Sequence, residues 1–433
     1  MSTVAMDAAA ATAGSDVAGT TNLTAVGARL AAVCNMIEEH RHNGTSTMSA
    51  RRAATISGMI DDVAATAAEG KPRASRRKRR MCNARSYKQV SRLGKGGDSV
   101  VVRVRHRKTG QDVAVKSLRR GRGADFGEIL REACFMAACR GHPSHVALRC
   151  VARTPGTRDY SLVMDYVGPS LQQVLRERGR PFPEADVRRI MRQLLAGAEA
   201  MHEHGIVHRD IKPANILVGD GGAVKICGYG MAKSMAERDP PYCIAGTIGY
   251  MSPEVLVKNT EHGTEVDAWS LGVIMAELVA GKRPFDGEDE ANQLFKIFDV
   301  LGVPCKAAWQ ALKPQVFDDE AQGWRVRQRR VGHRSRLREM FPEELLSKQG
   351  FEVLKGLLTC DPSKRLTAAA ALRCPWFTDN VDGGHGPVAS SMTGAAMTKA
   401  RSLVGLLPAF AGKMAMMFAG RALRLLRPKV LFK

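Results

Sequence analysis

Two kinds of hydrophobic spacing divide this chain of 433 residues into a β-rich part and a helical part that follows it. β-branched residues dominate Val100–Val104 and Val113–Val115, which predicts two strands of an antiparallel sheet. Apolar residues then recur every three or four positions from Val187 to Met201, which predicts an amphipathic helix. Residues 266–279 and 351–359 also have helical spacing. We therefore expect an α+β fold with a small β-rich lobe followed by a larger helical lobe.

The net charge of +22 is spread along the whole chain. Both ends and the middle carry more lysine and arginine than aspartate and glutamate. A basic excess of this size indicates an acidic partner, such as nucleic acid, nucleotide, an anionic membrane or an acidic protein. Because the excess is not concentrated in one segment, it does not choose among these classes.

Residues 1–86 are rich in alanine and threonine and poor in aromatic residues. Such a composition buries too little apolar surface to offset the entropy lost on ordering, so we expect a disordered arm. The arm contains a dense basic run, formed by Lys71, Arg73, Arg76, Arg77, Lys78, Arg79 and Arg80. This run is either a nuclear-localisation or nucleic-acid-binding signal or a solvated stretch of charge before a domain. Ten irregularly spaced cysteines without a C-x-x-C pair indicate a reducing compartment, so we expect the protein in the nucleus, the cytoplasm or both.

Residues 378–433 form a basic, partly amphipathic tail. No acidic residue follows Asp382, and Lys413, Arg421 and Arg424 are interspersed among apolar residues. Pro408 interrupts the apolar stretch, so we do not expect it to span a membrane. The tail either lies on an anionic membrane surface or packs on the preceding domain.

A glycine-rich turn joins the first two predicted strands. It consists of Leu93, Gly94, Lys95, Gly96, Gly97, Asp98 and Ser99. Backbone amides in such a turn can approach phosphate oxygens closely, because no side chain stands in the way. Taken alone, the turn is more typical of an ordinary hairpin.

A lysine and a glutamate follow at positions that suit phosphate binding. Lys116 lies at the end of a predicted strand, where its ammonium group can pair with phosphates. Glu132, sixteen residues further on, lies in a predicted helix and is suitably placed to orient that lysine. Taken separately, both residues are more typical of surface charges.

The loop from His208 to Asn215 concentrates several functional residue types between a predicted helix and a short strand at 216–218. Asp210 can accept or orient the proton of a hydroxyl group. Lys212 can neutralise charge on a transferred phosphoryl group, and Asn215 can hold a divalent cation. This combination is the strongest indication of chemistry in the sequence.

Motifs along the chain together resemble those of the eukaryotic protein-kinase family. In order, they are Leu93–Gly96, Val113–Lys116, His208–Asn215, Ser252–Glu254 and Asp267–Gly272. The resemblance covers residues 87–377 and implies the two-lobe kinase fold, with lobes at about 87–164 and 168–377. Lys212 and Gly246–Thr247 are similar to the serine/threonine branch. Pro284–Glu290 and Gln293–Phe298 resemble cyclin-dependent kinases, most of all the plant cyclin-dependent-kinase-like proteins of the F type.

The resemblance implies that this protein transfers the γ-phosphate of ATP to serine or threonine of a protein substrate with the help of Mg²⁺. The catalytic residues that it implies are Lys116, Glu132, Asp210, Lys212, Asn215 and Thr247. The ATP site that it implies comprises the glycine-rich turn, Val101, Ala114, Lys116, Met164, Asp165, Val167 and Leu217. Met164 would be the gatekeeper, and Glu254 and Arg365 would form an ion pair in the large lobe. A cyclin or another regulatory protein would be a further partner.

One departure from the family pattern affects catalysis directly. The family's Asp-Phe-Gly triplet is replaced by Gly228–Tyr229–Gly230, which removes the magnesium-binding aspartate and leaves Asn215 as the implied ligand. We therefore expect weakened Mg²⁺ binding and transfer slowed by several orders of magnitude. A recent substitution, an allele or a sequencing error at one codon base is the alternative.

Other departures concern regulation and specificity. Ser99 replaces the third glycine of the turn, and Tyr242 replaces the activation-loop threonine, so Glu237 or Asp239 is the expected partner of Arg209. Residues 248–251 lack the tryptophan and arginine linked to proline-directed substrates. Residues 128–132 do not match the cyclin-binding helix, so cyclin dependence is only an analogy.

Three functional hypotheses remain open at this point. The chain is an active serine/threonine kinase, a nucleotide-binding pseudokinase that acts as scaffold or decoy, or a nucleic-acid-binding protein. The third is not favoured, because no aromatic residue for base stacking is interleaved with the basic run. An arginine cluster at 325–338 is either a docking surface for an acidic partner or a solvated face.

Overall fold

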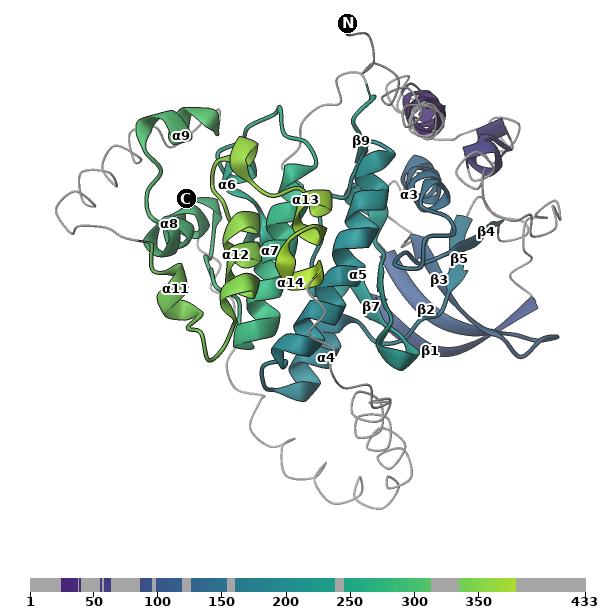
Figure 1. Cartoon of the computed structure of the whole chain (residues 1–433). Helices are drawn as coiled ribbons and strands as arrows, with labels where there is room; N and C mark the ends of the chain where they lie inside the picture. The colour runs from purple at the N-terminus through teal and green to yellow at the C-terminus, as the bar shows by residue number, and fades with distance from the viewer. Residues whose placement is uncertain are drawn as a thin grey trace, which may run out of the picture. The chain divides into compact units, whose positions relative to one another are not determined.

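The computed structural model describes residues 25–37, 39, 55–56, 58–63, 86–95, 99–118, 126–153, 160–237, 245–312 and 335–378 (Figure 1). The chain divides into two units, residues 1–381 and residues 382–433, and all described residues belong to the first. The basic run at 71–80 and, except for Thr378, the basic tail lie outside the described residues.

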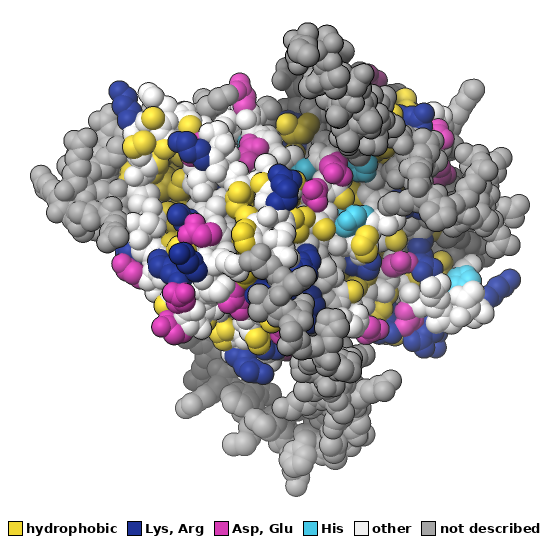
Figure 2. Space-filling model, in the orientation of Figure 1, with side chains coloured by type: hydrophobic (Ala, Val, Ile, Leu, Met, Phe, Trp, Pro, Cys, Tyr) yellow, Lys and Arg dark blue, Asp and Glu magenta, His cyan; other side chains and the backbone are white. Residues whose placement is uncertain are grey.

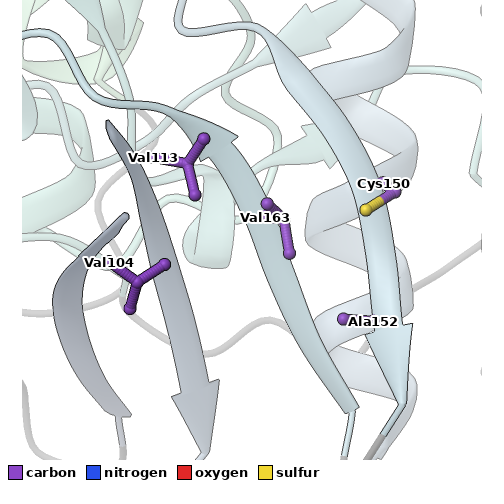
Figure 3. Close-up of a cluster of buried hydrophobic side chains, with 5 residues drawn as sticks. All are labelled: Val104, Val113, Cys150, Ala152 and Val163. Atoms are coloured by element: carbon purple, nitrogen blue, oxygen red, sulfur yellow. The ribbon is translucent and has the colours of Figure 1, made fainter. Parts of the chain in front are cut away.

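An antiparallel five-stranded sheet forms the first lobe, as the β-branched runs predicted. Its strands are β1 (Tyr87–Lys95), β2 (Ser99–His106), β3 (Asp112–Leu118), β4 (Leu148–Arg153) and β5 (Tyr160–Asp165), in the order β1-β2-β3-β5-β4. Alternate side chains point to one face because successive residues of a strand face opposite sides. Figure 3 shows the resulting cluster of Val104, Val113, Cys150, Ala152 and Val163, all buried.

The helix α3 (Phe126–Ala138) packs against β4 and β5 of this sheet. It is buried nearly throughout, from Ile129 to Cys139, with Arg131 as the half-buried exception. A helix that is buried on all sides must be covered by other elements besides the sheet.

Helices form the second lobe. They are α4 (Leu171–Arg178), α5 (Glu184–Glu203), α6 (Pro253–Leu256), α7 (Glu265–Ala280), α8 (Glu290–Leu301), α9 (Lys306–Ala311), α11 (Leu337–Met340), α12 (Lys348–Leu357), α13 (Ala368–Leu372) and α14 (Pro375–Thr378). The apolar stripe predicted between Val187 and Met201 is the buried face of α5, and Gly205 follows this helix with φ +67°. The predicted helix at 266–279 corresponds to α7, which is buried on nearly all sides. The order of sheet and helices confirms the expected α+β two-lobe fold.

Two short strand pairs fix the loops between the lobes. They are β6 (Ile206–Val207) with β9 (Lys233–Ser234), and β7 (Ile216–Val218) with β8 (Val224–Ile226). The loop His208–Asn215 runs from β6 to β7, and the triplet Gly228–Gly230 follows β8. Strand pairing therefore brings together two segments that the sequence separates.

The expectation of a disordered arm does not hold for two parts of residues 1–86. Residues 25–37 and most of residues 55–63 are helical, and they bury apolar side chains such as Leu30 and Ile60. The composition of residues 1–86 did not reveal these helices, because a short apolar stripe is enough to stabilise a helix once another surface covers it. None of the described helices is both long and apolar enough to cross a membrane.

Candidate active site

Lys116 of β3 and Glu132 of α3 form the first part of the site. The ammonium Nζ of Lys116 lies 2.6 Å from Oε2 of Glu132, and the side chains are 19% and 5% exposed. The partial burial of the pair limits screening by water. The structure therefore brings together the lysine and glutamate that the sequence singled out.

The loop that carries Asp210 is anchored by a buried carboxylate from α7. Asp267 accepts hydrogen bonds from the backbone N–H of His208 at 2.8 Å and of Arg209 at 2.9 Å. Burial alone would raise the pKa of Asp267, but hydrogen bonds from His202 and His208 lower it below its usual value. The anchored turn holds Arg209 at φ +64°, a conformation that costs a non-glycine residue energy. Sequence reasoning quoted Asp267 only as part of a motif and missed this role.

The carboxylate of Asp210 is the centre of a four-residue network. Thr247 donates its hydroxyl to Oδ1 of Asp210 at 2.8 Å, and Nζ of Lys212 lies 2.8 Å from Oδ2. Lys212 also donates to the Thr247 hydroxyl at 2.7 Å. Asn215 donates through Nδ2 to Oδ2 of Asp210 at 3.0 Å. Four of the six predicted catalytic residues therefore meet around one carboxylate.

Gly228 lies directly beside this network. Its backbone has φ +82°, and a Cβ added there would lie 2.7 Å from Oδ1 and 2.8 Å from Cγ of Asn215. Two residues further, a Cβ on Gly230 would lie 3.8 Å from Oε2 of Glu132 and 3.9 Å from Nζ of Lys116. The triplet Gly228–Gly230 thus lies between the Lys116–Glu132 pair and the Asp210 network.

Comparison with known proteins identifies this arrangement. The protein kinase domain family matches residues 87–377, which is more than half of the chain. The chain belongs to the protein kinase family. "Putative cyclin-dependent kinase F-2" of rice is 47% identical over 301 residues, which cover 68% of this chain and 90% of that protein. The family implies use of ATP, Mg²⁺ and protein substrates in general.

Two further relatives of the cyclin-dependent type are less similar to this chain than that rice protein is. "Cell division control protein 2 homolog 3" of Trypanosoma brucei brucei is 36% identical over 300 residues, 68% of this chain and 92% of that protein. "Cyclin-dependent kinase G1" of Arabidopsis thaliana is 34% identical over 305 residues, and the chain spans about half of its length, 48%. These similarities place the chain among the cyclin-dependent-kinase-like serine/threonine kinases of plants, as the motifs indicated.

The residues around Gly228 do not fit a magnesium site with two protein ligands. Mg²⁺ prefers carboxylate oxygens, and position 228 carries no side chain. The Asp210 carboxylate already contacts Lys212, Asn215 and Thr247, which leaves the amide oxygen of Asn215 as the remaining donor. In the described part of the chain, no group of three His, Cys, Asp or Glu side chains could hold a metal ion.

The nucleotide-binding residues that the resemblance implied lie around β2, β3 and β5. Ala114 pairs with Met164 between β3 and β5, and both are buried. Val101 faces Lys116 across β2 and β3, while Gly94 faces Val101 across β1 and β2. These pairings connect the strand residues of the implied nucleotide site through neighbouring positions of β1, β2, β3 and β5.

The remaining members of the implied nucleotide site are only partly described. Leu93, 42% exposed, lies on β1, and Ser99 begins β2. Leu217 bridges to Ser170, and Val167 is half-buried after β5. The Asp165 carboxylate accepts a bond from Nε of Arg149 at 2.5 Å. Gly96, Gly97, Asp98 and the side chain of Lys95 lie outside the described residues.

Tyr229, the residue in place of the family's phenylalanine, has a polar partner. Its hydroxyl lies 2.6 Å from Nδ1 of His145, while Nε2 of His145 lies 2.9 Å from the carbonyl of Gly197. Burial, together with the nearby His142, lowers the pKa of His145 to about 3, so its ring is neutral. Nε2 must donate to the carbonyl, so Nδ1 accepts from the Tyr229 hydroxyl. This bond was not foreseen, because 84 residues separate its partners.

Glu237 does not take the partner expected from the sequence. Its carboxylate accepts two bonds from Nη2 of Arg131 on α3, at 2.7 and 2.9 Å. Nε of Arg209, the expected partner, instead donates to the carbonyl of Met231 at 2.7 Å. Asp239 and Tyr242 lie outside the described residues.

The implied ion pair of the large lobe is present and completely buried. Two guanidinium nitrogens of Arg365 lie 2.5 and 2.8 Å from the two carboxylate oxygens of Glu254. Neither side chain is exposed. The carbonyl of Thr359 accepts a further bond from Nε of Arg365 at 2.9 Å. The pair ties α6 to the segment before α13.

Proposed function

We propose that this kinase transfers phosphate from ATP to protein serine or threonine, at a rate reduced by Gly228. The observation that carries the proposal is the Asp210–Lys212–Thr247 network beside a position 228 that lacks a carboxylate. The network supports hydroxyl chemistry, while the missing carboxylate removes charge neutralisation where phosphoryl transfer needs it most.

The chemical step uses groups that the structure places close together. Asp210 orients the substrate hydroxyl and accepts its proton, as the hydroxyl oxygen bonds to the γ-phosphorus and the bond to the β,γ-bridging oxygen breaks. Lys212 lies 2.8 Å from the Asp210 carboxylate and neutralises charge on the transferred group. Lys116, held by Glu132, contributes positive charge to the phosphates of the nucleotide.

The direct test is phosphate incorporation by the purified full chain. We expect slow but measurable transfer from γ-labelled ATP to a generic basic protein substrate in the presence of Mg²⁺. The matched control is Asp210→Asn, which keeps the size of the side chain and removes its charge. Incorporation no greater than that of the Asp210→Asn variant contradicts transfer by this site.

A second candidate function is that of a nucleotide-binding pseudokinase acting as scaffold or decoy. It is favoured by the approach of Asn215 to Gly228, since the amide oxygen occupies the space that a side chain at 228 would need. Thermal unfolding with ATP, with and without Mg²⁺, separates the two candidates. Equal stabilisation without Mg²⁺ favours the pseudokinase, whereas stabilisation that requires Mg²⁺ favours the working enzyme.

The face drawn in Figure 2 does not support nucleic-acid binding. On the face drawn in Figure 2, lysine and arginine side chains alternate with aspartate and glutamate instead of gathering in one patch. Of the predicted cluster at 325–338, Arg336 lies 3.1 Å from Asp299, and Arg338 donates to the carbonyl of Leu346. The location in nucleus or cytoplasm, regulation by a cyclin and membrane contact of the tail remain proposals from the sequence.

A further inference from the structure

Residues 25–37, here called the arm helix, have one buried face. Its buried residues are Val26, Leu30, Ala31, Val33, Cys34 and Ile37, and Leu30, Val33 and Cys34 have no exposed surface. Their spacing of three, four and seven positions places most of them on one side of a helix. Ala28, Arg29 and Ala32, on the other side, are exposed. The arm helix therefore packs on another surface.

Contacts at both ends of the arm helix identify that surface. Near its start, a Cβ on Gly27 would lie 3.3 Å from the carbonyl oxygen of His204, just after α5. Near its end, Cys34 is buried close to the Glu237 carboxylate, Arg131 and Cys134, and burial raises the pKa of its thiol. Arg131 and Cys134 both belong to α3. The arm helix thus lies against α3 and the segment that follows β9.

Glu237 joins these elements through a single carboxylate. It accepts bonds from Arg131 of α3 and, at 3.0 Å, from the backbone N–H of Ser234 in β9. Cys34 of the arm helix lies close to the same carboxylate. Bonds to a shared, largely buried carboxylate couple the positions of the groups that make them.

The position of α3 matters for the proposed reaction because α3 carries Glu132. Glu132 is the neighbour of Arg131 in the sequence and contacts Lys116 at 2.6 Å. The strands β4 and β5 and the turn Tyr229–Met231 contact α3. Cys134 of α3 has no exposed surface and lies close to Cys34 of the arm helix. Removal of the arm helix would expose this side of α3 and remove one neighbour of the Glu237 carboxylate.

We propose that the arm helix is an intramolecular positioning element that holds α3 where Glu132 reaches Lys116. Its effect on phosphate transfer rests on the function proposed above, but its effect on α3 does not. Leu30 and Cys34 are the main positioning residues of the arm helix. A separate protein that bound this side of α3 would have to displace residues 25–37 first.

Amide hydrogen exchange of the full chain tests the proposal without reference to activity. Leu30→Glu places a charge in the buried face, so we expect the amides of residues 129–138 to exchange about tenfold faster or more. Ala32→Glu is the matched control, because it adds the same charge to the exposed side of the same helix. Leu30→Ala is a milder second variant, in case the charged one disturbs folding elsewhere. Unchanged exchange in α3, with the arm amides released in both Leu30 variants, would overturn the proposal.

A peptide of residues 22–40, added to the Leu30→Glu variant, provides a rescue. We expect it to restore slow exchange in α3, whereas the same peptide carrying Leu30→Glu should not. General unfolding predicts no rescue by either peptide, which would also count against the proposal. If the wild-type chain incorporates phosphate, Leu30→Glu should lower kcat and Ala32→Glu should not. An inactive wild-type chain would contradict the proposed kinase function while leaving the exchange result to decide on the arm helix.

Discussion

A Cβ on Gly228 would lie 2.7 Å from Oδ1 of Asn215, closer than two such atoms pack without strain. The side chain of Asn215 lies against Gly228. Its Nδ2 donates to the backbone carbonyl of Asp210, at 2.8 Å, and to the carboxylate of Asp210. The absence of an aspartate at position 228 is therefore accompanied by an asparagine that binds the carboxylate of Asp210, the proposed proton acceptor. The contact between Gly228 and Asn215 determines how variants that add a side chain at position 228 will behave.

Gly228→Asp should raise phosphate incorporation about a hundredfold or more, because the carboxylate restores a Mg²⁺ ligand whose contribution is several kcal/mol. Asn215 can rotate away, since only the end of its flexible side chain meets the new Cβ. Initial rates with γ-labelled ATP at several Mg²⁺ concentrations measure the effect.

Gly228→Ala is the matched control for this experiment. It introduces the same Cβ at φ +82° and the same crowding of Asn215, without the carboxylate. Both variants should lose about 1–2 kcal/mol of stability from the backbone strain. Equal rates for the alanine and aspartate variants would contradict a role of residue 228 in metal binding.

Thr247 should affect transfer through its hydroxyl. Thr247→Val removes the hydroxyl that bonds to both Lys212 and Asp210, so we expect kcat to fall about tenfold to a hundredfold. Thr247→Ser keeps the hydroxyl and should retain most of the rate. The measurement can be made in the Gly228→Asp background, where rates are higher. Similar rates for the valine and serine variants would show that the hydroxyl has no positioning role.

The buried ion pair should be far more important for stability than an exposed one. Arg365→Ala leaves the carboxylate of Glu254 buried without its partner, which should cost about 3–5 kcal/mol in urea unfolding. Lys355→Ala is the control, because its pair with Glu352 is more than half exposed and should contribute less than about 1 kcal/mol. Comparable losses in the two variants would contradict this interpretation of the Glu254–Arg365 pair.

Tyr229→Phe should destabilise the chain even though phenylalanine is the family's residue at this position. The substitution leaves Nδ1 of His145, buried and bonded at 2.6 Å, without its donor. We expect a loss of about 1–3 kcal/mol in the free energy of unfolding. Tyr87→Phe, at a half-buried tyrosine of β1, is the comparison and should change stability much less. An increase in stability on Tyr229→Phe would show that the hydroxyl is not needed.

Stability should fall as the pH drops below about 6.5. Burial lowers the pKa of His145 to about 3 in the folded chain, so between the two values only the unfolded chain binds this proton. The contribution of His145 to the free energy of unfolding is complete above about pH 6.5. Below that pH it is lost at up to about 1.4 kcal/mol per pH unit. Urea unfolding at pH 8, 7, 6 and 5 measures the slope, and His145→Gln should reduce it. The same slope in the variant would assign the titration to other groups.

The sequence predicted structure best where the pattern lies within a single continuous segment. The apolar stripe of α5 and the β-branched runs of β2 and β3 depend only on the spacing of neighbouring residues. The loop His208–Asn215 was also found directly, because its functional residues lie within eight positions. Gly228 was recognised as a departure from the sequence alone.

The contacts between distant segments were decided only by the tertiary structure. The arm helix was missed because a short apolar stripe in an alanine-rich segment is stable only against a partner surface, here α3. Strand pairing and packing also produce three contacts that the sequence did not predict. They are the bond between Tyr229 and His145, the bond between Arg131 and Glu237, and the contact of Asn215 with Gly228. The sequence by itself determined the two-lobe fold, the kinase motifs and the missing carboxylate. The tertiary structure decided how those motifs are held and what fills the space at Gly228. Only the folded chain brings side chains that are up to 192 residues apart within hydrogen-bonding distance.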